Sequence, residues 1–556
     1  MGVVGIVAVA VLARRIGLAA PFVLVIAGIG LSWIPGSPQV DPELILAGVL
    51  PLLLYAAALR MPVVDLRRDI KAISLLAFVL VVATTLSVGL LVDAALPGLG
   101  LPGSFALGAA LGPTDAVAAT SIGRRLGLPS RLLVILEGEG LINDASSLVL
   151  LRSAVAAVAA SVSVWHVAGD FVYAVAVAVA MGWVVGHLAV AARARLHDAQ
   201  LTTAVSFAVP FAAFLPTEAL HASGVLAVVV AGLTGGQHDP EVVRASDRLA
   251  ESVNWGTISF LLESAVFLLM GLQLRGLLDE VDAVHASVAT AVGLGALVTL
   301  VILAVRLVFV APLVMMLAKE SERAEELEPA FEKIRREVGL KARVAKSWRV
   351  EGVLHKIDRK SADAAFAASE RLGWRAGVVL GWAGMRGAIT VAAAQSLPED
   401  FPLRPQVLLV AFTAALLTLL VPGLSLPTVI RALKVPGDDP QADRKQLQDL
   451  LDSLALAAKE ELAAARAADE FPDDVLDQVQ KDLLGPLESA GQERGGDGPA
   501  DRDDYVNLTT RTLAAERRAL LAARAGGRYS TRVLRQVERR LDQAEGRMQQ
   551  LTEMAE

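Results

Sequence analysis

The sequence contains no cysteine among its 556 residues. This absence excludes disulfide frameworks, thiolate metal sites and cysteine nucleophiles. A Gly-x-x-x-x-Gly-Lys loop is also missing, so nothing suggests that ATP drives the protein. The few histidines form no cluster and no metal motif is present, which argues against an enzyme and predicts no cofactor. The net charge of −7 gives no reason to expect nucleic-acid binding.

The apolar residues make up 54% of the chain, too many for a single soluble globule to cover with polar surface. A disordered chain is excluded for the same reason. The 20% of charged residues lie mainly in two blocks, one at about 319–371 and one after Pro436. The sequence therefore predicts a membrane domain at 1–436 with a cytoplasmic insert at about 319–373, and a cytoplasmic helical domain at 437–556.

A helix needs about 20 apolar residues to cross a bilayer. The apolar runs predict about 13 transmembrane helices, of which the first and the ninth are short, so the expected fold class is an all-α polytopic membrane protein. The expected spans are 2–13, 17–34, 43–60, 71–92, 103–121, 132–156, 167–190, 201–217, 222–236, 256–276, 286–317, 376–397 and 406–430.

Basic residues are concentrated in every second loop between these spans. Because cytoplasmic loops carry the excess of Lys and Arg, the pattern places the N-terminus outside and the C-terminal tail in the cytoplasm, in a multi-pass protein of the cell membrane. The loops in question carry Arg14 and Arg15; Arg67, Arg68 and Lys71; Arg124, Arg125 and Arg131; Arg193 and Arg195; and Arg244 and Arg248.

Three spans contain ionisable residues at positions where a charge is costly. The fifth contains Gly112-Pro113-Thr114-Asp115, the sixth contains Glu137-Gly138-Glu139 and Asn143-Asp144, and the twelfth contains Gly384-Met385-Arg386-Gly387. Charges at such depth normally face the protein interior or a water-filled cavity. The Pro and Gly residues predict helix breaks in the fifth and twelfth spans, whose free carbonyls could coordinate a cation. Two interrupted helices in separate halves of the domain indicate an ion site at a repeat interface.

Other charged residues within the spans have simpler interpretations. A buried acid and a buried Arg most simply neutralise each other, so we expect Glu139 and Arg386 to form a structural ion pair. Arg306 and Arg152 are expected to snorkel toward span ends. Glu137 belongs to the site only if it lies deep enough. For Glu263 a packing role and a role in the ion path remain open.

Together these motifs resemble the monovalent cation:proton antiporter superfamily, in the branch of prokaryotic sodium/proton antiporters and eukaryotic sodium/proton exchangers. The resemblance covers about residues 10–433. It implies an inverted-repeat fold with two crossing interrupted helices, a core domain and a dimer domain, working as a homodimer. Many relatives carry Ser at the position of Gly140 and an acid at that of Ala56. The family pattern makes Asp144 the ion- and proton-binding carboxylate, with Thr114, Asp115 and Asn143 completing the site, and pairs Glu139 with Arg386.

The resemblance therefore implies a secondary antiporter that exchanges a monovalent cation, with Na+ favoured over K+ and Li+, for H+. The Asn143-Asp144 pair is associated in the family with electroneutral exchange. Asp144 would hold a proton or a cation in competition, and alternating access would carry either across. A K+/H+ antiporter is the nearest alternative. A channel-like or sensory membrane protein without coupled exchange is the alternative from another class.

The tail shows helical periodicity with many charges. Helices are expected near 443–468, 472–484, 505–525 and 531–554, with a linker at 491–499. The last helix places Val533, Val537, Leu541 and Met548 on one apolar stripe. The tail is interpreted either as a solvated helical appendage or as a regulatory or dimer-stabilising domain. In the insert, one or two amphipathic helices are expected at the inner membrane surface, where their basic residues could contact anionic lipid.

Overall fold

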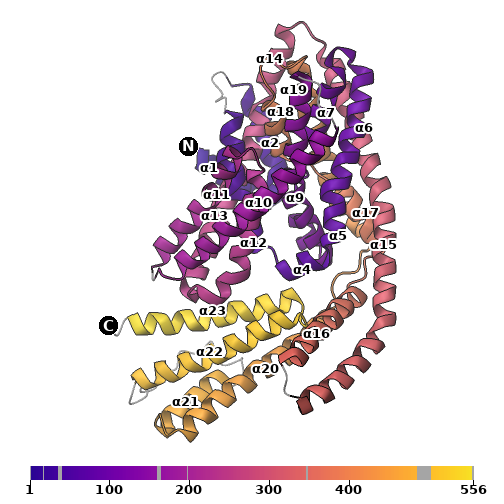
Figure 1. The fold of residues 1–556 in the computed structure, drawn as a ribbon. Coiled ribbons are helices and arrows are strands. Elements are labelled where there is room, and N and C mark those ends of the chain that lie inside the picture. Colours follow the sequence, from indigo (N-terminus) through magenta and orange to yellow (C-terminus); the bar gives the residue numbers. More distant parts are fainter. Residues whose placement is uncertain are drawn as a thin grey trace.

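The computed structural model describes residues 2–16, 18–34, 41–159, 164–196, 198–345, 348–484 and 502–553, and these residues contain helices but no strand. An apolar bundle of upright and tilted helices forms one part, and α20–α23 run across one end of it (Figure 1). Each of the expected spans coincides with one, two or three consecutive helical segments. The expected linker at 491–499 lies outside the described residues.

Seven helical segments are long and apolar enough to cross a membrane by length and composition: Ile70–Ala95, Ser130–Val158, Ala168–Arg193, Ala199–Ala219, Ala245–Ala283, Val288–Glu326 and Arg404–Leu433. Shorter apolar helices cover Val3–Ala13, Ala20–Ser32 and Leu44–Arg60. The chain is thus a multi-pass helical membrane protein, and the number of crossings stays a prediction.

One group of helices, here called the scaffold bundle, packs mainly within itself. In it α12 packs along α10, α3 and α11, and α13 packs along α2 and α11. The scaffold bundle comprises α1 (Gly2–Ile16), α2 (Ala20–Ser32), η1 (Leu44–Val49), α3 (Leu50–Arg60), α10 (Val164–Arg193), α11 (Ala199–Ala219), α12 (Gly224–Val242) and α13 (Ala245–Leu272).

A second group, here called the core bundle, is built in the same way. Its α6 packs along α7 and α15, α9 packs along α7 and α8, and α19 packs along α15 and α18. The core bundle comprises α5 (Ile70–Ser74), η2 (Leu75–Val79), α6 (Leu80–Ala95), η3 (Pro97–Leu99), α7 (Gly100–Ala110), α8 (Ala116–Arg125), α9 (Ser130–Ala159), α15 (Val288–Ala345), α17 (Trp374–Trp382), α18 (Ala388–Gln395) and α19 (Arg404–Leu433). Connecting helices are α4 (Val63–Arg68), α14 (Leu274–Ala283) and α16 (Trp348–Ser369).

Glycines allow close helix contacts in the scaffold bundle. A Cβ added at Gly28 would lie 2.3 Å from the Leu268 carbonyl oxygen, and one at Gly271 would lie 2.2 Å from the Val25 carbonyl oxygen. Helices α2 and α13 therefore cross with their backbones in contact, the packing that small residues permit between membrane helices.

A buried ion cluster joins the scaffold helices near one end. Arg193 of α10 has no exposed side-chain surface and pairs with Asp239 of α12 at 2.8 Å and with Glu251 of α13. Ser206 of α11 donates to Glu251 and accepts from the Trp255 indole at 2.9 Å. One guanidinium thus ties four helices together. Arg193 was expected as a loop charge, and its burial shows that the basic-loop pattern does not distinguish a solvated Arg from a structural one.

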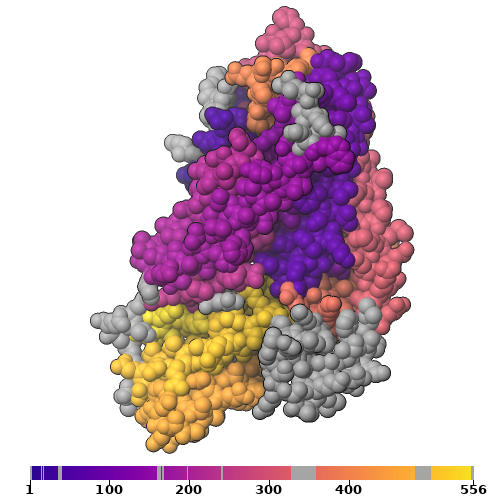
Figure 2. All heavy atoms as spheres, in the orientation of Figure 1, coloured from indigo at the N-terminus to yellow at the C-terminus, as the bar shows by residue number. Residues whose placement is uncertain are grey.

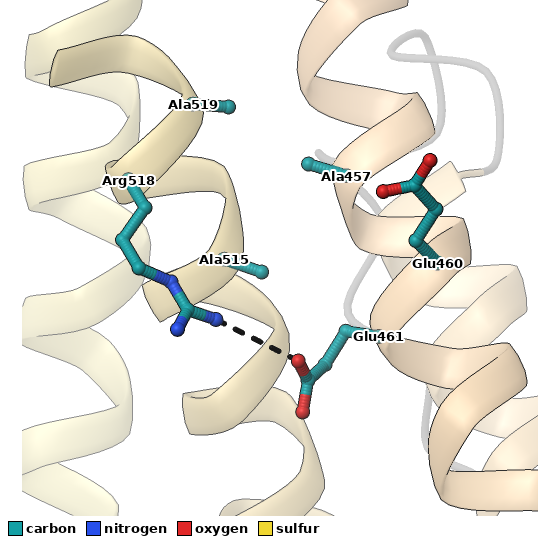
Figure 3. Close-up of a pocket in the computed structure, with 6 residues that line it drawn as sticks. All are labelled: Ala457, Glu460, Glu461, Ala515, Arg518 and Ala519. Carbon is teal, nitrogen blue, oxygen red and sulfur yellow. Dashed lines mark ion pairs between the residues drawn. The ribbon is translucent and has the colours of Figure 1, made fainter. Parts of the chain in front are cut away.

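The tail folds into α20 (Pro440–Ala467), α21 (Asp473–Leu484), α22 (Arg502–Gly526) and α23 (Thr531–Glu553), at the positions expected from periodicity. The predicted stripe is confirmed, because Val533, Val537 and Leu541 are buried against α20 and α22 and Met548 packs on the same cluster. A groove between α20 and α22 is lined by alanines and by Glu461, which lies 3.6 Å from Arg518 (Figure 3).

The tail contacts the membrane domain over a broad face, here called the tail face (Figure 2). Arg68 donates to the Gly527 carbonyl at 2.6 Å, and Arg248 pairs with Asp542. Arg131 donates to the Glu370 carbonyl at 2.8 Å, next to the tail. These arginines belong to three of the loops expected to share one side, and the structure places them on one face. We call the opposite end of the bundle the far face.

Glu516 of α22 offers a test of the tail packing. Burial, together with the nearby Glu545, raises the pKa of Glu516 from 4.5 to about 7. Between these two values the folded tail binds more protons than the unfolded one, so its stability falls as pH rises from about 4.5 to 7. We expect Glu516→Gln to reduce this fall, measured as hydrogen-exchange protection of α22 and α23 in the intact protein across this range. An unchanged pH slope in the variant would contradict the assignment.

Candidate ion-binding site

Two helix breaks cross in the middle of the core bundle. The chain is non-helical from Leu111 to Asp115, between α7 and α8, and again between α17 and α18. The two segments bond to each other: the Asp115 amide donates to the Met385 carbonyl at 2.7 Å, and Arg386 Nε donates to the Leu111 carbonyl. The backbone groups released by one break are therefore partly satisfied by the other, which is how irregular backbone persists at membrane depth.

The glycines of the breaks make room for specific neighbours. A Cβ at Gly112 would lie 2.2 Å from Ser147 Oγ, and one at Gly387 would lie 2.9 Å from the Asp115 Cβ. A Cβ at Gly384 would lie 2.3 Å from Arg306 Nε. Such separations are below van der Waals contact, so a larger residue at any of these positions would force the neighbouring side chain to move. Gly112, Pro113, Gly384 and Gly387, expected as helix-breaking residues, all lie in or beside the two non-helical segments.

Helix α9 places a polar face against the first break. Asn143 donates to Thr114 Oγ1 at 2.6 Å, and the Thr114 hydroxyl donates to Glu139 at 3.2 Å. Asn143 and Glu139 are buried, four residues apart on the same side of the helix. The structure therefore brings together three of the residues that the sequence singled out, and Thr114 links the other two.

The ion pair of Glu139 is formed with Arg306, and the expected pairing with Arg386 was wrong. Arg306 Nη2 lies 2.8 Å from Glu139 Oε2, Arg306 Nη1 contacts Oε1, and both side chains are almost fully buried. Arg306 also donates to the Leu380 carbonyl at 3.2 Å. Arg386 lines the same cavity, of about 10 Å³, but one of its terminal nitrogens has no partner among the described residues.

The burial of Arg306, which allows it to pair with Glu139, has a physical cause. Arg306 was expected to snorkel, yet it is only 3% exposed, because the missing side chain at Gly384 leaves space for its guanidinium beside α17. The signal was present in the sequence: Arg306 lies within the apolar run at 286–317 and not at its end. A charge at that depth needs a partner within the protein, and this holds for Arg306 as it does for Glu139.

Several buried oxygens around Asp144 have no hydrogen-bond donor among the described residues. They are Oδ1 of Asp144, Oδ1 of Asn143, Oδ2 of Asp115 and Oγ of Ser147. The Asp144 side chain is buried and has Asp115 as its charged neighbour, while the other Asp115 oxygen caps α8 by accepting from the Val117 amide at 2.8 Å. Buried oxygens without donors carry a desolvation cost, and oxygen atoms are the ligands that hard cations prefer. Ser147 was not expected from the sequence.

Glu137 and Glu263 lie outside this group. Glu137 pairs with Arg124 and is partly exposed, so it belongs to the surface of the core bundle. Glu263 is half-buried on α13 of the scaffold bundle, four residues after Ser259, which accepts from Arg60 at 3.1 Å. It is a charged neighbour of Arg60 and of Asp115.

The model of a protein family described as "Sodium/hydrogen exchanger, transmembrane" matches residues 3–432. The chain belongs to this family. An uncharacterized Na+/H+ exchanger of Mycobacterium tuberculosis (strain H37Rv) is 30% identical over 97% of this chain and 94% of its own length. A sodium, potassium, lithium and rubidium/H+ antiporter of Bacillus pumilus is 34% identical over 42% of this chain and 36% of its own length.

The fold agrees with this membership. The structure of a sodium proton antiporter from Methanocaldococcus jannaschii at pH 8 aligns with a TM-score of 0.55 at 14% identity, over 78% of this chain and 96% of that one. As a member of the sodium/hydrogen exchanger family, the protein is a secondary transporter rather than an enzyme. Its fold is that of the antiporters, with two interrupted helices crossing in the core bundle.

A cavity of about 430 Å³ opens between the two bundles of the exchanger, toward the far face. Its walls include Leu148 and Leu151 of α9 on one side and Phe214 of α11 on the other. Leu148 is one helical turn from Asp144, so the cavity ends close to the site. At its rim Arg152 of the core bundle pairs with Glu218 of the scaffold bundle at 2.5 Å, with Arg152 half-exposed as expected for a snorkelling side chain.

The corrected ion pair generates a stability prediction. Arg306→Ala would strand the buried Glu139 carboxylate, which costs about 3–5 kcal/mol. We expect a clearly lower melting temperature in detergent for this variant than for Arg386→Ala, which removes a bond to one carbonyl. The double variant Glu139→Ala/Arg306→Ala should recover part of the loss, because no unpaired charge remains. Equal losses for Arg306→Ala and Arg386→Ala would argue against the pairing.

Proposed function

We propose that the exchanger couples movement of one monovalent cation, with Na+ favoured, to movement of one H+ in the opposite direction, with Asp144 binding either ion. The observation that carries this proposal is the group of buried oxygens without donors around Asp144. Thr114, Asp115 and Asn143 are the further residues of the site. Thr114 and Asn143 are already bonded to each other, so a bound cation would take the remaining oxygens of Asn143, Asp115 and Asp144.

Charge balance explains why Asp144 is suited to the exchange and Glu139 is not. The Glu139 carboxylate is neutralised by Arg306, so it has little reason to take up a proton or a cation. Asp144 has no ion-pair partner among the residues that the structure describes, and an uncompensated buried charge is costly. A proton or a cation would each neutralise it, and each would exclude the other. Glu139 and Arg306 then have a structural role.

Alternating access would come from movement of the core bundle against the scaffold bundle. The cavity at their junction extends from the far face to within a helical turn of Asp144, which fits one open side of such a cycle. The crossed breaks move together because they are hydrogen-bonded to each other. If only the neutralised site crosses between sides, the downhill flow of one ion drives the other uphill.

Sidedness and assembly form part of the same proposal. The tail face carries the arginines of the basic loops, so the tail face is assigned to the cytoplasm and the N-terminus to the outside of the cell membrane. A homodimer is expected, with the scaffold bundle providing the contact between protomers. The ion is assigned as Na+ because a relative that matches 97% of the chain is described as an uncharacterized Na+/H+ exchanger. The name of the Bacillus pumilus relative includes potassium and lithium, so K+/H+ exchange is the second candidate.

Asp144→Asn is expected to abolish exchange while leaving the protein folded. Asn cannot carry the charge that a proton or cation neutralises, but it has almost the same size. The measurement is proton flux into proteoliposomes under imposed gradients of Na+, K+ or Li+, alongside a melting curve of the same variant. Glu137→Gln is the matched control, because Glu137 pairs with Arg124 outside the site, and it should retain most of the activity. Normal exchange by Asp144→Asn would refute the role of Asp144.

Exchange is expected to be insensitive to membrane potential, because one positive charge moves in each direction. A potential of 100 mV changes the energy of each net charge moved by about 2.3 kcal/mol, so a net charge per cycle would produce a large change in rate. The test is the exchange rate at potentials clamped with an ionophore selective for an ion that the protein does not transport. Proton flux without any cation gradient dependence would instead favour the channel-like alternative.

A further inference from the structure

Two histidines that are far apart in the sequence meet in the scaffold bundle, away from the proposed ion site. The rings of His187 of α10 and His238 of α12 have centroids 5.1 Å apart and planes inclined by 55°. Both side chains are half-buried, and the Trp183 ring lies against His187 at a centroid distance of 4.3 Å. Such a cluster can be simple aromatic packing, so the roles of the ring nitrogens decide what else it can do.

The two imidazoles make the same hydrogen bond. Nδ1 of His187 lies 2.9 Å from the Trp183 carbonyl oxygen, and Nδ1 of His238 lies 2.9 Å from the Thr234 carbonyl oxygen. A carbonyl oxygen only accepts, so in the neutral rings each Nδ1 carries the proton and each Nε2 keeps its lone pair. Histidines that bind metals have this arrangement, in which the other ring nitrogen donates to a backbone carbonyl and fixes the tautomer and orientation of the ring.

The two helices hold the rings in a fixed register. A Cβ added at Gly186 would lie 2.7 Å from the Thr234 Cβ, so the backbones are in close contact just before the histidines. Just after them, Arg193 pairs with Asp239 at 2.8 Å. Contacts on both sides of the pair therefore prevent the rings from moving apart along the helices. The last turn of α12 follows His238 directly, and the negative end of a helix favours a cation.

We propose that His187 and His238 bind one divalent transition-metal ion of the class that imidazole nitrogens prefer, such as Zn2+, Ni2+ or Cu2+. The ion would take Nε2 of each ring. Water would complete its coordination, because the described residues contain no group of three or more His, Asp and Glu side chains that could hold a metal.

The proposed site differs from the oxygen-lined group around Asp144 in both ligands and place. It lies near the tail face, where the Gly236 carbonyl of α12 accepts from Arg524 of the tail at 3.3 Å. A metal ion bound there would link α10 to α12 and stabilise the scaffold bundle. This inference does not rest on the proposed exchange.

The site is tested by titrating the intact protein in detergent with Ni2+, after treatment with a chelator and with a purification tag that contains no histidine. We expect saturable binding of one Ni2+ per chain. His187→Asn and His238→Asn each keep an amide N–H where Nδ1 donates but lack Nε2. Each should weaken the Ni2+ affinity about tenfold or more, since loss of an outer-shell partner alone typically costs about 10–100-fold.

Two variants serve as controls for this titration. His285→Asn is the matched control, because His285 also bonds a carbonyl through Nδ1, at 3.3 Å, but lies between α14 and α15, away from the pair. Asp144→Asn removes the carboxylate of the proposed ion site. Both should bind Ni2+ as the unmodified protein does.

Trp183 reports where the metal binds. Ni2+ held by His187 would lie close to the indole ring and quench its fluorescence. Trp183→Phe keeps an aromatic ring against His187, so this variant should retain Ni2+ binding in calorimetry but lose the quenching that accompanies it.

The outcomes that would overturn the site are distinct from those that bear on exchange. Absence of saturable Ni2+ binding would overturn it, as would an unchanged affinity in both His187→Asn and His238→Asn. Loss of Ni2+ binding in Asp144→Asn would place the metal at the oxygen-lined group and would equally overturn it. All of these are binding measurements, so the exchange of a cation for H+ is accepted or rejected separately by the flux assay.

Discussion

Neutralisation of buried charge is the constraint on which the membrane domain depends. Transfer of an unpaired ion into a region without water costs far more free energy than a single interaction within the protein provides. Each buried charge therefore needs a partner or must acquire one. Arg193 has Asp239 and Glu251, and Glu139 has Arg306. These satisfied charges tie helices together. Asp144 lacks such a partner among the described residues, and this difference separates the proposed transport site from its supporting structure.

The same constraint explains why the backbone can be broken at the site. Helices α7 and α17 end in the middle of the core bundle and would leave backbone groups unpaired there. The two breaks satisfy some of these groups in each other, through the Asp115 amide and the Arg386 guanidinium. Arg386 therefore stabilises the crossing rather than a carboxylate. Close packing at Gly384 and Gly387 then brings Arg306 and Asp115 into positions that a larger side chain would occupy.

The tail adds a second level of organisation. Its own apolar clusters show that it folds as a helical bundle, while its arginines and acids reach both bundles of the membrane domain. The contact at Arg248 is largely shielded from solvent, which makes it stronger than the exposed ion pairs on the tail surface.

The positions of the helices and of the two breaks could be predicted from the sequence, but the partners of the buried side chains could not. Hydrophobic runs located the helices, and Gly112-Pro113 and Gly384 located the breaks, because these signals act through local backbone and solvation. The partner of Glu139 and the role of Ser147 were missed. Pairing depends on which helices lie side by side, and the sequence does not distinguish between Arg306 and Arg386, which line the same cavity.

The sequence by itself determined that the protein is a polytopic helical transporter and that a helical tail follows, and it singled out Thr114, Asp115, Asn143 and Asp144 as the residues of the proposed site. Only the tertiary structure decided that Arg306 neutralises Glu139, that Arg193 is buried, and that α23 lies across the scaffold bundle. The physical reason is that local sequence sets the cost of burying a group, whereas the group that offsets this cost comes from a distant helix placed there by packing.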